Sequence, residues 1–160
     1  VFNVDYLALN ITPSLDVPPA DIDLEQSFLE FTTGYEVMPD LAIVAGFRFV
    51  DISTEATIKI GPNPTIKGED DWIDPVVGVD YRKIYSEKWR LFAHADIGGF
   101  GVGSDFSWQL SGFVGYMPSK NWNLYGGYRH LDIDYTSDNA QKFFYNVTVS
   151  GPLFGFGYHF

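Results

Sequence analysis

The sequence predicts an all-β fold, a closed antiparallel up-and-down transmembrane barrel of about eight strands that occupies residues 1–160 as one domain. Three observations lead to this prediction. Apolar and polar residues alternate with period two in one segment after another, turn residues separate these segments, and aromatic residues make up 18% of the chain. A hydrophobic share of 46% supplies enough apolar surface for one folded domain.

The first half of the chain predicts four strands, at residues 1–10, 24–37, 41–52 and 72–85. Residues 11–23 carry three prolines, which predict a loop because proline removes ladder donors. Met38-Pro-Asp40 predicts a tight turn, and 53–71 predicts a long acidic loop that ends in Gly68-Glu-Asp-Asp71. Pro75 is expected near the start of its strand or at a bulge, since a ladder strand loses a hydrogen bond at proline.

The second half predicts four further strands, at residues 89–98, 107–116, 122–129 and 143–160. Residues 86–88 and 118–121 are expected to be short turns, 99–105 a glycine-rich connection and 132–142 an acidic loop. Gly46-Phe-Arg-Phe-Val-Asp-Ile52 is echoed by Gly127-Tyr-Arg-His-Leu-Asp-Ile133, and each segment follows a short turn. The echo indicates a repeated strand that rises from the same rim.

The apolar strand faces are expected to point outwards, to lipid. They carry roughly thirty large side chains, whereas an eight-stranded barrel has an interior only just wide enough for side chains. The opposite faces carry glycines and single charges, which suit a narrow polar lumen. No run of about 18 apolar residues is present, which excludes a transmembrane helix but leaves a barrel open, because barrel strands need only about ten alternating residues. A soluble lipocalin-like barrel is the alternative.

The lengths of the connections predict an orientation. Those after the second, fourth and sixth strands are short, and the others are longer and acidic, as expected of periplasmic turns and extracellular loops. The C-terminus would then lie on the periplasmic side, with Phe160 and an aromatic girdle near that rim. The predicted girdle consists of Tyr35, Trp89, Tyr116 and Trp122.

The even number of strands predicts how the barrel closes. The last strand is expected to pair with the first, residues 153–159 with residues 3–9, which leaves no edge exposed in lipid. The pattern at Val1 begins in the middle of a strand, so an export segment is expected to have preceded it. If an upstream hairpin is also missing, the natural barrel has ten strands.

The C-terminal stretch Gly151-Pro-Leu-Phe-Gly-Phe-Gly-Tyr-His-Phe160 carries a resemblance. Gly155, Tyr158 and Phe160 resemble the C-terminal assembly signal of bacterial outer-membrane β-barrels. Residues 74–82, 98–105 and 127–132 look like segments of a family of uncharacterised small outer-membrane proteins of the OmpA, OmpX and OmpW type. The resemblance implies the outer membrane of a Gram-negative bacterium and insertion by the barrel assembly machinery. It brings no known reaction with it.

A set of charged residues shares the predicted lumen face. In a narrow interior each charge needs a partner, since an unpaired buried charge costs several kcal/mol. The set therefore predicts a structural salt-bridge network that plugs the barrel, and the alternative is a polar path for a small solute or a proton. Arg48 and Arg129 are each expected within ion-pair distance of a lumen carboxylate such as Glu30, Asp80 or Asp96. The full set is Asp5, Glu30, Arg48, Asp80, Arg82, Arg90, His94, Asp96 and Arg129.

An enzyme is not expected. Some outer-membrane lipid-modifying enzymes are eight-stranded barrels with a lipid-facing His and Ser, which makes His130 with Asp132, or His94 with Asp96, the starting point of the less favoured enzymatic reading. No Ser lies at a matching alternate position beside His130. A solvated rim is favoured over a metal site for the acids at 69–71, 132, 134 and 138, because their spacing matches no metal loop. No cofactor and no metal is expected.

The sequence thus predicts an integral outer-membrane β-barrel protein with a structural, adhesive or envelope-interaction role, and a narrow pore as the alternative. The expected partners are outer-membrane lipid, lipopolysaccharide and a protein held by the acidic extracellular loops. A formal net charge of −11 with only ten Lys and Arg residues argues against nucleic acid. The chain has no Cys, which excludes disulfides and thiolate metal sites.

Overall fold

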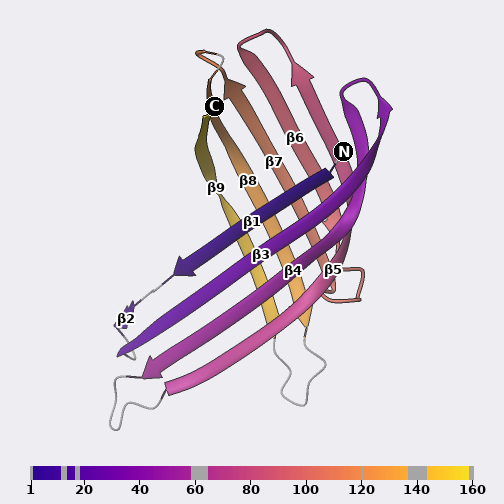
Figure 1. Cartoon of the computed structure of the whole chain (residues 1–160). Helices are drawn as coiled ribbons and strands as arrows, with labels where there is room; N and C mark the ends of the chain where they lie inside the picture. Colours follow the sequence, from indigo (N-terminus) through magenta and orange to yellow (C-terminus); the bar gives the residue numbers. More distant parts are fainter. Residues whose placement is uncertain are drawn as a thin grey trace.

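The fold is described from a computed structural model that covers residues 2–11, 14–16, 19–58, 65–119, 121–136 and 144–158. In this part of the chain all regular structure is β (Figure 1). The strands are β1 (Phe2–Ile11), β2 (Ser14–Asp16), β3 (Pro19–Met38), β4 (Leu41–Ile58), β5 (Thr65–Ile84), β6 (Trp89–Gly98), β7 (Phe106–Tyr116), β8 (Trp122–Thr136) and β9 (Phe144–Tyr158). No helix in the described ranges is long and apolar enough to cross a membrane.

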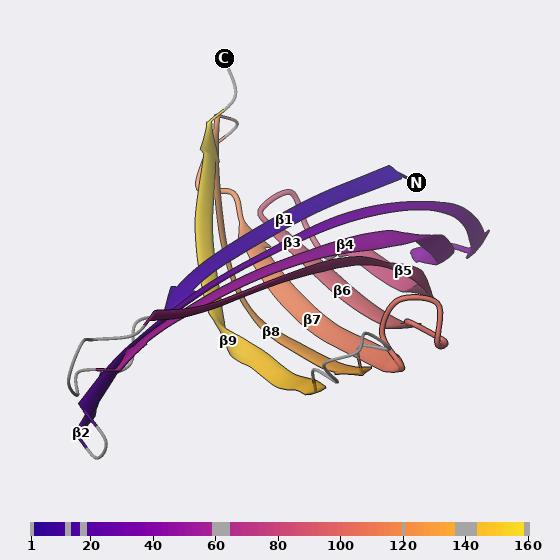
Figure 2. The same ribbon diagram turned by 90° about the horizontal axis from the view of Figure 1, so that it is seen from below.

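The strands form one antiparallel sheet in the order β1-β3-β4-β5-β6-β7-β8-β9, and the short β2 pairs with β3. Each long strand thus lies beside its neighbour in sequence, which confirms the predicted up-and-down meander. The sheet is strongly curled, and β1 to β5 form a wall that faces β7 to β9 (Figure 2). One end of the sheet, the turn rim, carries the connections at 39–40, 85–88 and 117–121, and the other end is the loop rim.

Two predicted loops are wrong over most of their length, because strands continue through them. β3 begins at Pro19 and β4 ends at Ile58, and Asp23 pairs with Glu55 in the ladder between them. β5 begins at Thr65, so the acids at 69–71 lie on a strand rather than in a loop. β8 likewise continues to Thr136. Backbone pairing does not require apolar side chains, so the ladder persists where the apolar signal in the sequence stops.

Pro75 lies in the middle of β5, not at its start, and its ladder with β4 continues without a register shift. Its carbonyl oxygen accepts a hydrogen bond from the Gly99 amide (3.1 Å), on the side of β6. Pairing with β6 ends at Val76 and Gly98. The donor that proline lacks therefore falls where the β6 ladder has already ended.

The sheet has an apolar outer face and a largely polar inner face, as the alternation predicts. Phe47 is 56% exposed on the outside, whereas its neighbour Arg48 is fully buried inside. On β4 the outer face is apolar from Leu41 to Phe49 and then continues with Asp51, Ser53 and Glu55. The same change occurs at the same level on both neighbours, because Asp51 is the register partner of Ser27 on β3 and of Asp71 on β5. The outer face thus carries an apolar band next to the turn rim and an acidic zone next to the loop rim.

An apolar core closes the interior toward the loop rim. Phe28, Val50, Ile52, Trp72, Leu131 and Ile133 are buried there, which brings β3, β4 and β5 against β8. The rings of Trp72 and Tyr135 stack at 4.0 Å. The sequence predicted glycines and single charges for the interior, and a buried apolar core toward the loop rim was not predicted.

Closure by pairing of the first and last strands, the predicted outcome, is absent from the described ladders. β1 pairs with β3 and β9 pairs with β8, so β1 and β9 are the two edges of the sheet. Instead of joining edge to edge, these strands contribute side chains to the same interior. Leu7 and Leu9 of β1 and Val147 and Val149 of β9 all pack against the apolar core.

Candidate functional site

The middle of the interior holds a buried ion-pair network centred on Arg48 of β4. The ladder places Glu30 of β3 directly opposite Arg48, and the curl of the sheet brings Asp96 of β6 to the same guanidinium. Arg48 donates to Glu30 Oε2 from Nε (3.0 Å) and Nη2 (2.7 Å), and from Nη2 to Asp96 Oδ1 (2.7 Å). Nη1 donates to Ser107 Oγ at 3.3 Å. Every nitrogen of this buried cation thus has a partner, as burial requires.

His94 of β6 links the network to β5. Its ring lies between two carboxylates, with Nδ1 2.6 Å from Asp80 Oδ1 and Nε2 2.7 Å from Asp96 Oδ2. A neutral imidazole has one N–H, so both contacts are hydrogen bonds only if a second proton is present, on the ring or on a carboxyl. The network contains three carboxylates and two guanidinium groups, and a protonated His94 brings its formal net charge to zero. These groups are Glu30, Asp80, Asp96, Arg48 and Arg82.

Toward the turn rim the network continues through Asn3 of β1. Asp80 Oδ2 accepts hydrogen bonds from Asn3 Nδ2 (2.8 Å) and Arg82 Nη2 (3.0 Å). Arg82 also donates to Asn3 Oδ1, and Asn3 donates to Thr32 Oγ1 at 3.2 Å. The first strand is thereby tied to β3 and β5 across the interior. The sequence did not predict Asn3 as a member of the network, because an amide carries no charge and therefore does not require an ion-pair partner.

Arg129 of β8 forms a second, smaller group. Its Nη1 pairs with Asp5 Oδ2 of β1 at 2.6 Å, and Nε and Nη2 donate to Gln109 Oε1 of β7 at 2.8 and 2.5 Å. Both predicted arginines therefore pair with an interior carboxylate, although Arg129 pairs with Asp5 rather than with one of the three acids given as examples. The remaining member of the predicted set, Arg90, lies near the turn rim and joins neither group in the described contacts.

Asp74 of β5 is a buried carboxylate that the predicted set omitted. It accepts hydrogen bonds from the backbone N–H of Ser104 (2.6 Å) and from Ser104 Oγ (2.8 Å), and both residues are fully buried. This contact fastens the glycine-rich connection 99–105 to the sheet. Nothing in the sequence pairs Asp74 with Ser104, because the two are brought together by the register of β5 to β7.

Glu30, His94 and Asp96 offer ligand atoms within 4.8 Å of one another, the spacing of a candidate metal site. The chemistry of the group fits a metal ion poorly. Arg48 already donates to both carboxylates, and both nitrogens of His94 already face carboxylate oxygens. A cation would have to displace the guanidinium or sit beside it at strong repulsion. The geometry is that of an ion-pair network.

A cavity of about 260 Å³ borders the network on the side of β7 and β8. Its lining joins the two charged groups, since it includes Glu30 and His94 of the first and Asp5 and Arg129 of the second. The charged middle of the interior is therefore not completely filled. Beyond it, toward the loop rim, the apolar core begins.

The four predicted girdle aromatics all lie at the turn rim. Trp89 and Tyr116 are register partners on β6 and β7 with ring centroids 4.7 Å apart. Trp122 lies 5.1 Å from Tyr158 of β9, and Tyr35 is 78% exposed near the end of β3. Of the predicted assembly signal, Gly155 and Tyr158 belong to β9, and Phe160 lies outside the described residues.

On the outer face, the His130 ring packs at 4.6 Å against Trp108, and Asp132 accepts a hydrogen bond from Thr148 Oγ1 (2.6 Å). The ladder between β8 and β9 places Ser150 directly opposite His130. Alternate positions along the strand of His130 hold no serine next to it, and only the register shows that the neighbouring strand supplies one. No hydrogen bond between His130 and Ser150 is among the described contacts.

Comparison with known proteins returned no match: no protein-family model, no curated protein and no solved structure is similar to this chain. The likeness to small outer-membrane proteins thus rests on the short motifs of the sequence. What the structure establishes is an all-β, antiparallel, up-and-down sheet curled as in a small barrel, with an interior ion-pair network and an apolar outer band.

Proposed function

We propose that this protein is an integral β-barrel protein of a bacterial outer membrane, with a structural or adhesive role in the envelope and an interior plugged by the Arg48 network. The observation that carries the proposal is the apolar outer band. Large apolar side chains that are half exposed or more lie along the band, among them Phe2, Ile43, Phe47, Leu110 and Phe154. Water is a poor solvent for a continuous apolar surface of this extent, and lipid is a good one.

The height of the band fits the proposal. From Leu41 to Phe49 the chain takes eight steps of about 3.3 Å, or about 26 Å along the strand, and a tilt of about 40° reduces this to about 20 Å. Outer-membrane barrels carry a lipid-facing band about 25 Å tall. The aromatic residues of the turn rim then lie at one interface, where amphipathic rings are favoured. The acidic zone lies beyond the other interface.

The acidic zone replaces the predicted acidic loops as the candidate contact surface. β3, β4 and β5 have 20, 18 and 20 residues, about twice what a tilted membrane strand needs. Their continuations carry outward acids on neighbouring strands, and the zone is suited to a basic protein segment or to lipopolysaccharide bridged by cations. Its outward acids are Asp23, Glu25, Asp51, Glu55, Glu69 and Asp71.

The absence of Cys in the chain makes a sharp test possible. Single Cys variants along the outer face of β4 are reconstituted in lipid vesicles and exposed to a water-soluble maleimide. Ile43→Cys and Phe47→Cys should be protected, and Asp51→Cys and Glu55→Cys should label readily. Each variant unfolded in denaturant is the control for intrinsic reactivity. Equal labelling at all four positions, or a native protein that stays monodisperse without detergent, would contradict the membrane proposal.

A narrow pore is the second candidate, and the 260 Å³ cavity beside the network favours it. A plugged barrel passes almost no current across a planar bilayer, whereas a pore conducts in steps. We expect the native protein to be nearly silent, because Arg48 and the apolar core both obstruct the interior. Steady single-channel steps that change with Gln109→Ala or Ser111→Phe, two residues of the cavity lining, would favour the pore instead.

A further inference from the structure

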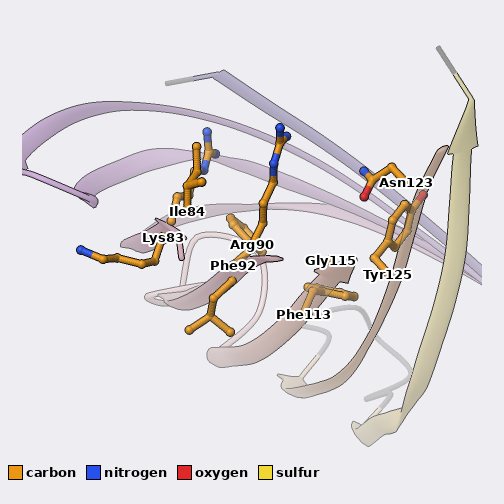
Figure 3. Close-up of a pocket in the computed structure, with 10 residues that line it drawn as sticks. Lys83, Ile84, Arg90, Phe92, Phe113, Gly115, Asn123 and Tyr125 are labelled. Atoms are coloured by element: carbon orange, nitrogen blue, oxygen red, sulfur yellow. The ribbon is translucent and has the colours of Figure 1, made fainter. Parts of the chain in front are cut away.

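A second cavity, of about 350 Å³, opens at the turn rim and borders the charge network at Arg82. Its walls are the inner faces of β5, β6, β7 and β8, and Arg90 and Phe92 of β6 and Tyr125 of β8 project into it (Figure 3). Lys83 points away from it and pairs with Asp40 at 2.5 Å. The volume falls in the range of small-molecule sites.

The apolar wall of the cavity consists of aromatic rings held in place by glycines. The rings of Phe92 and Phe113 lie 6.1 Å apart, and Phe113 packs on Gly127, where a Cβ atom would come within 2.5 Å of the ring. Tyr125 packs in the same way on Gly155, where a Cβ atom would lie 2.2 Å from the ring. Both rings thus lie in close contact with glycines, where a larger residue would displace them.

Of the three cationic side chains in the lining, Arg90 is the one without a partner among the described residues. Arg48, Arg82 and Arg129 each pair with a carboxylate, but no described residue pairs with Arg90 or accepts a hydrogen bond from it. Arg90 is an exposed residue of the cavity lining, so a ligand can reach its guanidinium. A guanidinium beside aromatic walls is suited to a carboxylate, which it binds in two parallel hydrogen bonds.

A second polar group of the lining, the side-chain oxygen of Asn123, also lacks a partner among the described residues. Asn123 Oδ1 is buried and accepts no hydrogen bond. A buried acceptor without a donor is destabilising, so the site favours a ligand that brings an N–H or O–H to this wall.

We propose that this cavity binds a small aromatic carboxylate, with its carboxylate on Arg90, its ring against Phe92 and Phe113, and a hydroxyl or amide donor toward Asn123. The flat aromatic walls favour a ring over a flexible alkyl chain, since offset and tilted ring pairs add to the gain from burial. The inference goes beyond the proposed envelope role and does not depend on it, because it uses only the cavity and its lining.

The test uses the folded full chain and 3-(4-hydroxyphenyl)propionate as the probe, with binding measured by titration calorimetry. Its neutral amide should bind about tenfold more weakly or worse, because the charge-assisted hydrogen bond is lost. Arg90→Gln should weaken the acid by a similar factor and leave the amide unchanged. Lys88→Gln, which removes an equal charge from the neighbouring turn, is the matched control and should bind normally.

Two further measurements keep the proposal falsifiable if Arg90→Gln folds poorly. Phe113→Leu should weaken the acid and the amide equally, whereas Phe106→Leu, on the outer face, should weaken neither. Acetate at the same concentration should not compete. No binding of the acid, equal binding of acid and amide, or displacement by acetate would each overturn the proposal, and none of these results bears on whether the band lies in a membrane.

Discussion

Arg48 is the residue on which the interior depends. It is fully buried, and its partners come from β3, β6 and β7, so one side chain connects strands on both sides of the curl. Burial of a charge is unfavourable, and the network offsets this through hydrogen bonds rather than adding a large net gain. The role of Arg48 is therefore to specify which strands face each other across the interior.

Removal of this cation leaves two buried carboxylates without their shared partner. Arg48→Met should lower the free energy of unfolding by about 3–5 kcal/mol, as for other broken buried pairs. Urea unfolding followed by tryptophan fluorescence measures the loss. Lys88→Met, at an exposed position, should change stability by less than about 0.5 kcal/mol. A loss below 1 kcal/mol for Arg48→Met would show that the network is not well formed.

His94 should respond to substitution differently from Arg48, because an imidazole is charged only when both ring nitrogens carry a proton, whereas a guanidinium is always charged. His94→Gln offers an N–H donor toward one carboxylate, but its amide oxygen can hydrogen-bond the other only if that carboxyl is protonated. We expect a loss of about 1–3 kcal/mol at neutral pH, measured by urea unfolding. Asp80→Asn in the same background should recover part of that loss, and complete additivity of the two changes would argue against the direct contact.

At the scale of the strand, β9 carries both the terminal motif and a packing constraint. Gly155 belongs to the motif, and it is also the position on which the Tyr125 ring rests. Its identity thus has a structural cause that is independent of recognition by an assembly machinery. Gly151, on the same strand, has open space where its Cβ atom would lie.

These two glycines give a matched pair of substitutions. Gly155→Ala should destabilise the protein by about 1–3 kcal/mol through overpacking against Tyr125, and Gly151→Ala should be nearly neutral. Tyr125→Ala in the Gly155→Ala background should relieve the clash. Equal effects of the two alanines in chemical unfolding would show that the ring does not rest on Gly155.

Phe160 tests the other role of the C-terminal stretch. If the proposed insertion signal ends there, Phe160→Ala should reduce the amount of folded protein in the outer membrane while leaving the unfolding of already folded protein unchanged. Phe154→Ala, on the same strand but outside the motif, is the control. The comparison is made by membrane fractionation and heat-modifiable gel mobility, and normal levels of Phe160→Ala would count against the signal.

At the scale of the whole molecule, two free edges are the main consequence of the topology. β1 and β9 each have one unpaired side in the described sheet. In hydrocarbon each unsatisfied backbone group costs several kcal/mol, so the membrane proposal requires that these edges be covered. In water the same groups would be solvated at little cost.

Amide hydrogen exchange in lipid nanodiscs measures directly whether the backbone amides of these two edge strands are covered. If the proposal holds, the amides at 3–9 and 153–157 should exchange as slowly as those in the middle of β4. Fast exchange at either edge would contradict residence in the bilayer. A disulfide between Tyr6→Cys and Phe156→Cys would show that the two edges cover each other, with the register partners Tyr6→Cys and Leu29→Cys as the positive control.

By itself the sequence determined the strand type, the strand order and, within the predicted strands, the side of the sheet on which a side chain lies. These follow from local alternation, because the period of a strand is two and needs no knowledge of distant residues. Arg48, His94 and Phe47 could therefore be assigned to faces directly. Strand ends failed at 19–23, 53–58 and 65–71, where polar residues continue a ladder that backbone hydrogen bonds sustain without an apolar signal.

Only the tertiary structure decided which interior groups meet. Asp5 rather than Asp80 pairs with Arg129, Asp74 holds Ser104, and Arg90, beside an aromatic cavity, has no partner among the described residues. These outcomes depend on the register between strands and on how tightly the sheet curls. Both are sums of many small contacts along whole strands, and no single residue or short motif encodes them.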